Sequence, residues 1–229
     1  MEGIHILLIS SSPEIASLTQ CLHADRYAVA TVADASVGIV QALSGAYTLV
    51  ILDLPLPTMS GLEALRQIRQ HSLVPVLILS DTLHETERIM ALEFGADDYL
   101  PKPIVLPEFT ARIRTILRRA HTGVSVFGNL VKANALELNR GTHRVKLHAE
   151  DIALTASEFE LLEFLVKRAG QAVSREDLSQ QIFGRPLNPD DRSIDVHLSN
   201  LRKKLHANNA SAACQIKAVR GVGYTFILL

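Results

Sequence analysis

Hydrophobic residues in the first half of the chain follow two alternating patterns. Short apolar runs rich in β-branched residues predict strands, and the segments between them carry apolar residues three or four positions apart, as one-sided helices do. The predicted strands are Ile4–Ile9, Tyr27–Val32, Thr48–Asp53, Pro75–Ser80 and Asp98–Leu100. This alternation indicates an α/β fold: a doubly wound, flavodoxin-like five-stranded parallel sheet with helices on both faces.

The pattern changes after a last helix that ends near Arg119. Residues Phe127–Leu154 predict several short strands, and a terminal hairpin is predicted over Ala218–Leu229. The helices predicted between them are Ser157–Arg168, Arg175–Phe183 and Arg192–Leu205. We therefore predict a first domain over residues 1–120, a polar linker over 121–126, and an α+β winged helix-turn-helix domain over 127–229.

Composition limits the class of protein. The chain has 229 residues, of which 48% are hydrophobic, so it can bury a sizeable core. It shows no apolar run long enough to predict a membrane span, and its first residues lack the features of a signal peptide. Cys21 and Cys214 match no metal-ligand spacing and predict free thiols. We expect a cytoplasmic protein with no membrane partner.

Charge is unevenly distributed along the chain. Residues 1–121 carry 9 Lys and Arg against 13 Asp and Glu, whereas residues 122–229 carry 14 against 11. An acidic half followed by a basic half favours nucleic-acid binding by the second half, although the excess of positive charge is small.

Three chemically active residues follow separate predicted strands of the parallel sheet. Asp53 ends the third strand, Ser80 ends the fourth, and Lys102 follows the fifth. In a doubly wound sheet these positions meet at the carboxyl edge, where ligands bind. The carboxylate could accept a phosphoryl group with the hydroxyl and ammonium as partners for its oxygens, or Asp53 and Lys102 could form an ion pair that only holds the loops.

Longer motifs carry a family resemblance that covers essentially the whole chain. Residues 52–61 and 92–103 resemble the phosphoacceptor and switch segments of response-regulator receivers of the OmpR/PhoB family. The segments 154–162 and 173–178 resemble the first two helices of that family's effector domain. The resemblance implies that Asp53 accepts phosphate, Ser80 and Tyr99 are switch residues, and Lys102 binds the phosphoryl group.

The first predicted strand is followed by a departure from the family pattern. Ser10 and Ser11 stand where such receivers carry paired acids that bind Mg²⁺, which depends on carboxylates to offset its dehydration. Smaller departures are Pro55, Ser60 and Ile104. We therefore predict no metal site and no cofactor, and a receiver that is atypical in phosphorylation.

The resemblance also implies a homodimer, because the family pairs receivers through the fourth helix, fifth strand and fifth helix. The matching positions are Arg88 with Glu108, and Asp97 or Asp98 with Arg112. A solvated charged face is the alternative, since exposed ion pairs contribute little to stability, but the full set of matching positions favours the interface.

The third helix of the second half has two distinct faces. Ile194, Leu198, Leu201 and Leu205 form one apolar stripe. The remaining positions supply candidate DNA contacts: Arg192, Ser193, Val196, His197, Ser199, Asn200, Arg202, Lys203 and Lys204. Asn200 could bond an adenine and Val196 a thymine methyl in the major groove, while an ordinary amphipathic surface helix remains the alternative.

The terminal hairpin and one loop add two further expectations. Arg220 precedes the glycines of the hairpin tip, where an arginine can enter a minor groove. The loop 184–191 falls where the family has a segment that can face RNA polymerase, with a plain connector as the alternative.

Three functions compete. The first is a sequence-specific, DNA-binding transcriptional regulator of two-component type whose receiver mediates dimerisation and is atypical in phosphorylation. The second is a conventional regulator activated by a sensor histidine kinase at Asp53. The third is an enzyme that uses Asp53, Ser80 and Lys102 on a small substrate. Because the sequence offers no phosphate-binding loop, second acid or base, or metal ligands, we predict that the protein is not an enzyme.

Overall fold

The computed structural model describes residues 4–81, 85–121, 130–188, 190–207 and 214–229. The chain divides into two compact units, residues 1–117 and 118–229. The predicted linker, 121–126, lies outside the described residues except for His121, which ends helix α5.

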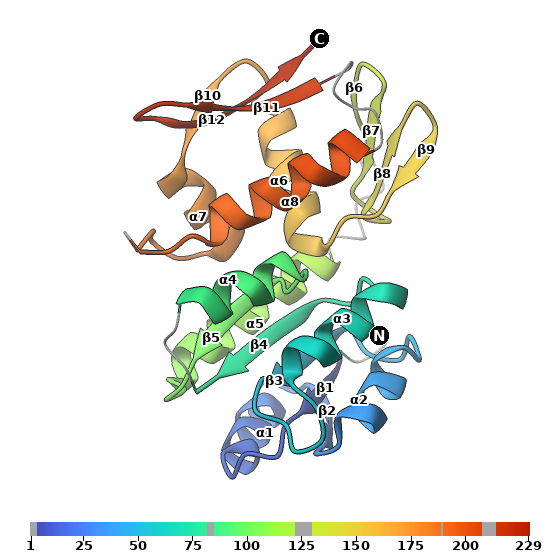
Figure 1. The fold of residues 1–229 in the computed structure, drawn as a ribbon, viewed down its shortest axis with the longest axis vertical. Helices are drawn as coiled ribbons and strands as arrows, with labels where there is room; N and C mark the ends of the chain where they lie inside the picture. The colour runs from blue at the N-terminus through green and yellow to red at the C-terminus, as the bar shows by residue number, and fades with distance from the viewer. Residues whose placement is uncertain (1–3, 82–84, 122–129, 189, 208–213) are drawn as a thin grey trace. The chain divides into compact units, whose positions relative to one another are not determined.

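A parallel sheet forms the centre of the first unit (Figure 1). Its strands are β1 (His5–Ile9), β2 (Ala28–Val32), β3 (Leu49–Asp53), β4 (Val76–Ser80) and β5 (Asp98–Pro101). They lie in the order β2-β1-β3-β4-β5, and each neighbouring pair is parallel. Every residue of β3 and β4 is buried, which explains why these strands are almost continuously apolar.

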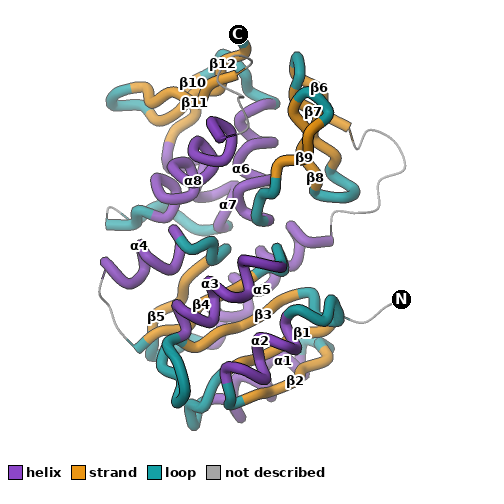
Figure 2. The backbone as a smooth tube through the Cα atoms, turned by 45° about the vertical axis from the view of Figure 1, so that its right-hand side comes forward, coloured by secondary structure: helices purple, strands orange, loops and turns teal. Residues whose placement is uncertain are grey.

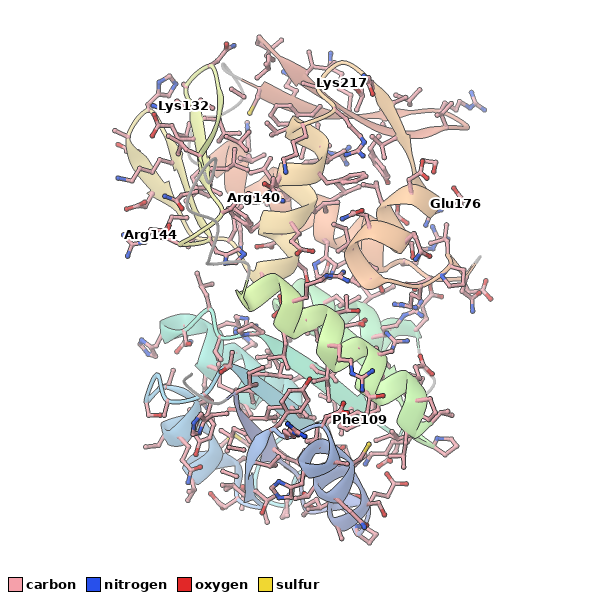
Figure 3. The ribbon with its side chains drawn as sticks, turned by 180° about the vertical axis from the view of Figure 1, so that it is seen from behind. Phe109, Lys132, Arg140, Arg144, Glu176 and Lys217 are labelled. Atoms are coloured by element: carbon pink, nitrogen blue, oxygen red, sulfur yellow. The ribbon has the colours of Figure 1, made fainter. Side chains whose placement is uncertain are left out.

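Helices cover both faces of this sheet (Figure 2). They are α1 (Ile15–Ala24), α2 (Ala35–Ala42), α3 (Gly61–His71), α4 (Glu85–Glu93) and α5 (Leu106–His121). Apolar residues of α1 and α5 pack on one face in a single cluster with β1, β3 and β4; Phe109 of α5, labelled in Figure 3, is fully buried there. Helices α2, α3 and α4 contact the other side of the unit's strands.

The second unit combines two small antiparallel sheets with a group of helices. Its strands are β6 (Leu130–Ala133), β7 (Leu136–Asn139), β8 (Arg144–Leu147), β9 (Glu150–Ile152), β10 (Ala172–Ser174), β11 (Cys214–Val219) and β12 (Gly223–Leu228). Its helices are α6 (Ala156–Val166), α7 (Arg175–Phe183) and α8 (Ser193–Ala207). Strands β6 to β9 form one sheet, and β10, β12 and β11, in that order, form the other.

One apolar cluster holds the second unit together. It joins β7 and β8 to α6, α7, α8 and the β11–β12 hairpin. Ile194, Leu198, Leu201 and Leu205, the stripe predicted on α8, are all members and are at most 5% exposed. The stripe therefore faces the core, and the remainder of α8 is left for other contacts.

The hairpin is held close to β10 at one glycine. Gly223 pairs with Ser174 across the sheet, and a Cβ atom at position 223 would lie 1.9 Å from the carbonyl oxygen of Val173. No side chain fits there, because atoms in proteins do not approach so closely without displacement of the backbone. Glycine is thus required for this contact, whereas Gly221 at the turn faces open space.

The predicted fold class is confirmed for both units. Most strand and helix bounds differ from the predictions by one or two residues, for example α8 begins at Ser193 and not at Arg192. The terminal hairpin begins earlier than predicted, at Cys214 and not at Ala218. The exact domain bounds, with the first domain ending at residue 120, stay a prediction. Among the described residues, no helix has the length and apolar character needed to cross a membrane.

The crowding at Gly223 leads to a stability prediction. Gly223→Ala should lower the free energy of unfolding of the second unit by about 3 kcal/mol, because the hairpin must separate from β10. Gly221→Ala is the matched control; it has room for a methyl group but a backbone φ of +73°, and should cost about 1 kcal/mol. Chemical denaturation measures both. Equal costs would contradict the packing argument.

Candidate functional site

Asp53 is the centre of the carboxyl edge of the parallel sheet. It ends β3 and has no exposure to solvent. Its Oδ2 atom accepts hydrogen bonds from the Ser10 hydroxyl at 2.6 Å and from the Lys102 ammonium at 2.9 Å. Its Oδ1 atom is buried and has no hydrogen-bond partner among the described residues. The sheet topology thus brings together the ends of β1, β3 and β5, as predicted for Asp53 and Lys102.

Lys102 is shared between two carboxylates. Its ammonium lies 2.9 Å from Asp53 and 3.1 Å from Asp81, whose side chain is 57% exposed. Burial lowers the pKa of Lys102, but the hydrogen bonds and charges of these two carboxylates more than offset it, so the net pKa is raised. The ammonium therefore remains charged and already has two anionic partners.

Ser80 lies at the end of β4 but is directed to a different partner. Its hydroxyl donates a 2.8 Å hydrogen bond to Glu87 of α4. Tyr99 in β5 is only 5% exposed. The sequence analysis singled out neither Asp81 nor Glu87 as a residue of this site. The available signal was their separation from Ser80, which is one and seven positions along the sequence.

The oxygen atoms around Asp53 fit Mg²⁺ poorly. Ser10 is buried and uses its hydroxyl on Asp53, and Ser11 is exposed. Neither adds a negative charge, and a hard divalent cation needs such charge to offset its dehydration. A cavity of about 540 Å³ borders Ser11, Glu14, Asp53, Asp81 and Lys102. Glu14 and Asp81 make it acidic, but Asp81 is paired with Lys102.

Of the predicted dimer residues, Arg112, Asp98 and Glu108 pair within the chain. Arg112 lies 2.7 Å from Asp98 and also binds Glu108, one helical turn earlier. Burial lowers the pKa of Arg112, but these carboxylates raise it overall. Arg88 is half-buried on α4.

The prediction that Asp97 contributes to a dimer surface is wrong. Its side chain has no exposure to solvent. Its Oδ2 atom accepts hydrogen bonds from Arg69 of α3 at 3.1 Å and from the amide of Val76 at 3.0 Å. Asp97 immediately precedes β5 and binds Arg69, whereas Asp98, the first residue of β5, pairs with Arg112.

Helix α8 presents fewer open side chains than its sequence predicts. Ser193 and His197 are 1% exposed, Val196 is 8% exposed and Asn200 is 7% exposed. The His197 ring lies 5.6 Å from the Phe183 ring of α7. These four side chains are therefore little exposed in this structure, and their role as DNA contacts stays a prediction.

Two basic residues of α8 bind other parts of the second unit. Lys204 lies 2.6 Å from Glu158, which also accepts a hydrogen bond from the amide of Thr155 at the start of α6. Arg202 donates its Nε–H to the carbonyl of Ile216 in β11 at 3.0 Å. Both are therefore engaged within the unit, whereas the sequence pattern predicts them as DNA contacts.

Some exposed positive charges of the second unit lie beside the start of α8, on α8 itself and on the hairpin, while others, such as Lys132 and Arg144, lie on the other sheet. Arg192, Lys203 and Arg220 are exposed, and Ser199 is half-buried. Lys217, labelled on β11 in Figure 3, is also exposed, and sequence reasoning did not single it out. Its position on the same hairpin as Arg220 was the available signal.

Comparisons with known proteins agree with the division into a receiver-like first unit and a winged-helix second unit. Residues 6–114 match the family model described as response regulator receiver domain, and residues 149–226 match the model described as transcriptional regulatory protein, C terminal. The chain is 37% identical over 228 residues to the transcriptional regulatory protein CpxR of Escherichia coli (strain K12), with 97% of each chain covered.

Two solved structures of similar length also match. A RitR mutant superposes with a TM-score of 0.75 at 26% identity, covering 97% of this chain and 98% of that one. DrrB, described as a Thermotoga maritima OmpR/PhoB homolog, superposes with a TM-score of 0.51 at 28% identity, covering 98% and 99%.

The buried pair Asp53–Lys102 leads to a second stability prediction. Lys102→Met should destabilise the first unit by about 3 kcal/mol, because it leaves a buried carboxylate without its cation. The double variant Asp53→Asn, Lys102→Met should recover much of this loss, since it removes the uncompensated charge. Urea denaturation at neutral pH measures both. A single variant as stable as the double variant would show that the pair does not stabilise the fold.

Proposed function

The chain belongs to the OmpR/PhoB family of response-regulator transcription factors, and from that premise we propose a specific mode of action. It is a DNA-binding regulator of the two-component type. Its second unit reads DNA by sequence, and its receiver takes up its working conformation without Mg²⁺-dependent phosphorylation of Asp53. The observation that carries the receiver proposal is the Ser10–Asp53 hydrogen bond, formed where the family has acids.

The contacts of Asp53 support this view of the receiver. One of its oxygens already accepts from Ser10 and Lys102, and Lys102 is also paired with Asp81. A transferring phosphoryl group depends on cations that stabilise its developing charge. Here serines replace the acids that would hold a metal ion, and the lysine is shared by two carboxylates. Both conditions disfavour phosphorylation.

The arrangement of α8 and the hairpin supports DNA binding by the second unit. An α-helix fits the major groove, and a hairpin beside it can reach the neighbouring minor groove. Arg192 and Lys203 at α8 and Arg220 on the hairpin are exposed cations that can bind phosphates or enter a groove. Asn200 and Val196 remain candidates for base contacts, although both are buried in this structure.

Dimerisation through the receiver and contact with RNA polymerase are part of the same proposal. The α4-β5-α5 elements include exposed Leu106 in the first turn of α5, and Glu108, which pairs with Arg112. The ion pair between Asp98 and Arg112 lies beside them. Gly184 caps the end of α7, and the loop that follows it is the segment that we propose to face RNA polymerase.

The receiver proposal predicts resistance to chemical phosphorylation. After incubation with acetyl phosphate and Mg²⁺, the intact mass of the protein should not increase by the roughly 80 Da of a phosphoryl group. Asp53→Ala, treated in the same way, is the control. Specific DNA binding should be unchanged by the same treatment. An adduct that is absent from Asp53→Ala would support the alternative, a conventional regulator served by a histidine kinase.

The DNA proposal predicts a salt-dependent affinity. Lys203→Ala and Arg220→Ala should each weaken binding and make the slope of log affinity against log salt shallower by about 0.9 for every phosphate that the variant no longer neutralises. Lys132→Ala, on the other sheet of the unit, is the matched control and should leave the slope unchanged (Figure 3). Duplex binding with no salt response would remove the basis of the DNA proposal.

A further inference from the structure

We propose that Asp195 and Arg202 are positioning residues, which fix the β11–β12 hairpin on α8 so that helix and hairpin meet DNA as one rigid unit. This inference rests on the proposed DNA-binding function. It also gives Arg202 a role other than the DNA contact that the sequence pattern predicts. The two residues are seven positions apart, which is two helical turns, so they lie on the same side of α8.

Asp195 uses both carboxylate oxygens inside the second unit. Its Oδ1 atom accepts a hydrogen bond from the Tyr224 hydroxyl at 2.5 Å. Its Oδ2 atom lies 2.5 Å from the guanidinium of Arg175, the first residue of α7. One side chain in the first turn of α8 therefore joins the hairpin strand β12 to α7. A carboxylate at this point would repel DNA phosphates, so its contribution to binding has to be indirect.

Arg202 makes the second connection to the hairpin. Its Nε–H donates to the carbonyl oxygen of Ile216 in β11 at 3.0 Å. Its guanidinium carbon lies 5.3 Å from the centre of the Tyr224 ring, within the range of a cation–π contact. The Tyr224 ring thus contacts Arg202, while its hydroxyl binds Asp195.

Tyr224 is close to the part of the hairpin that would reach DNA. It pairs with Ala218 across the hairpin and with Val173 on its other side. Arg220 lies in the turn four residues before it. Because both strands of the hairpin are bound to α8, one through Arg202 and the other through Asp195, the distance from Arg220 to the groove-reading helix is fixed before DNA arrives. A recognition site depends on such preorganisation, which is supplied by supporting residues that do not themselves contact the ligand.

The ionisation of Tyr224 agrees with this geometry. Partial burial, together with the hydrogen bond to Asp195 and its negative charge, raises the pKa of Tyr224 to about 12. In Asp195→Asn this pKa should fall towards the ordinary value near 10. Ultraviolet titration of the phenols, with Tyr224→Phe to identify the signal, measures it in the full chain.

DNA binding separates positioning from direct contact. Affinity is measured over a range of salt concentrations for a duplex that the wild-type protein selects from a random pool, and for a random duplex. Arg202→Ala and Asp195→Asn should each lower affinity for the selected duplex by about tenfold, with little effect on the random duplex and no change in salt slope. Lys203→Ala, one residue along α8, is the matched control and should make the slope shallower on both duplexes.

Asp195→Asn gives the sharpest distinction, because removing a negative charge near DNA should by itself strengthen binding. A weaker selected complex would thus have to come from impaired positioning. Tyr224→Phe keeps the ring beside Arg202 and removes only the hydroxyl, so it should reproduce the Asp195→Asn effect even if that variant folds poorly.

Two results would overturn the inference. One is an Arg202→Ala slope that becomes shallower by about 0.9 on both duplexes, which would make Arg202 a phosphate contact. The other is unchanged affinity for the selected duplex in both Asp195→Asn and Tyr224→Phe. If the wild-type protein shows no salt-dependent binding to any duplex, the proposed function itself fails, and that outcome is distinct from these two.

Discussion

A carboxylate without exposure to solvent must be compensated by charge, and the functional edge of the first unit depends on how Asp53 meets this requirement. Lys102 supplies the compensating cation and Ser10 a hydrogen bond. These groups come from the ends of three parallel strands, so the ion pair and the sheet topology support each other. A serine in place of an acid can donate a hydrogen bond to Asp53, which a carboxylate could not, and it removes a negative charge that would attract a metal ion.

The second unit also uses charged side chains to join its own elements. Lys204 binds Glu158 of α6, and Arg202 binds β11. Each of these residues adds to the positive charge of this half of the chain while it is engaged within the unit. The number of basic residues in this half therefore overstates how many are available to phosphates, so the exposed cations gain importance.

The sequence predicted those features that depend on periodicity and topology. The α8 stripe followed from its helical spacing, and the meeting of Asp53 with Lys102 followed from the parallel order of strands. It could not distinguish Asp97 from Asp98, since a shift of one residue in a strand exchanges the two faces. It also missed the burial of Val196 and Asn200, because helical spacing shows which residues share a face and not whether that face is covered.

The carboxylate of Glu158 has a consequence for the cooperativity of the second unit. The same oxygen accepts the Thr155 amide, which begins α6, and the Lys204 ammonium near the end of α8. Fraying of the last turn of α8 therefore removes a partner from the carboxylate that caps α6, 46 residues away in sequence. The two helix ends are expected to open together in native-state hydrogen exchange, as parts of one cooperative unit.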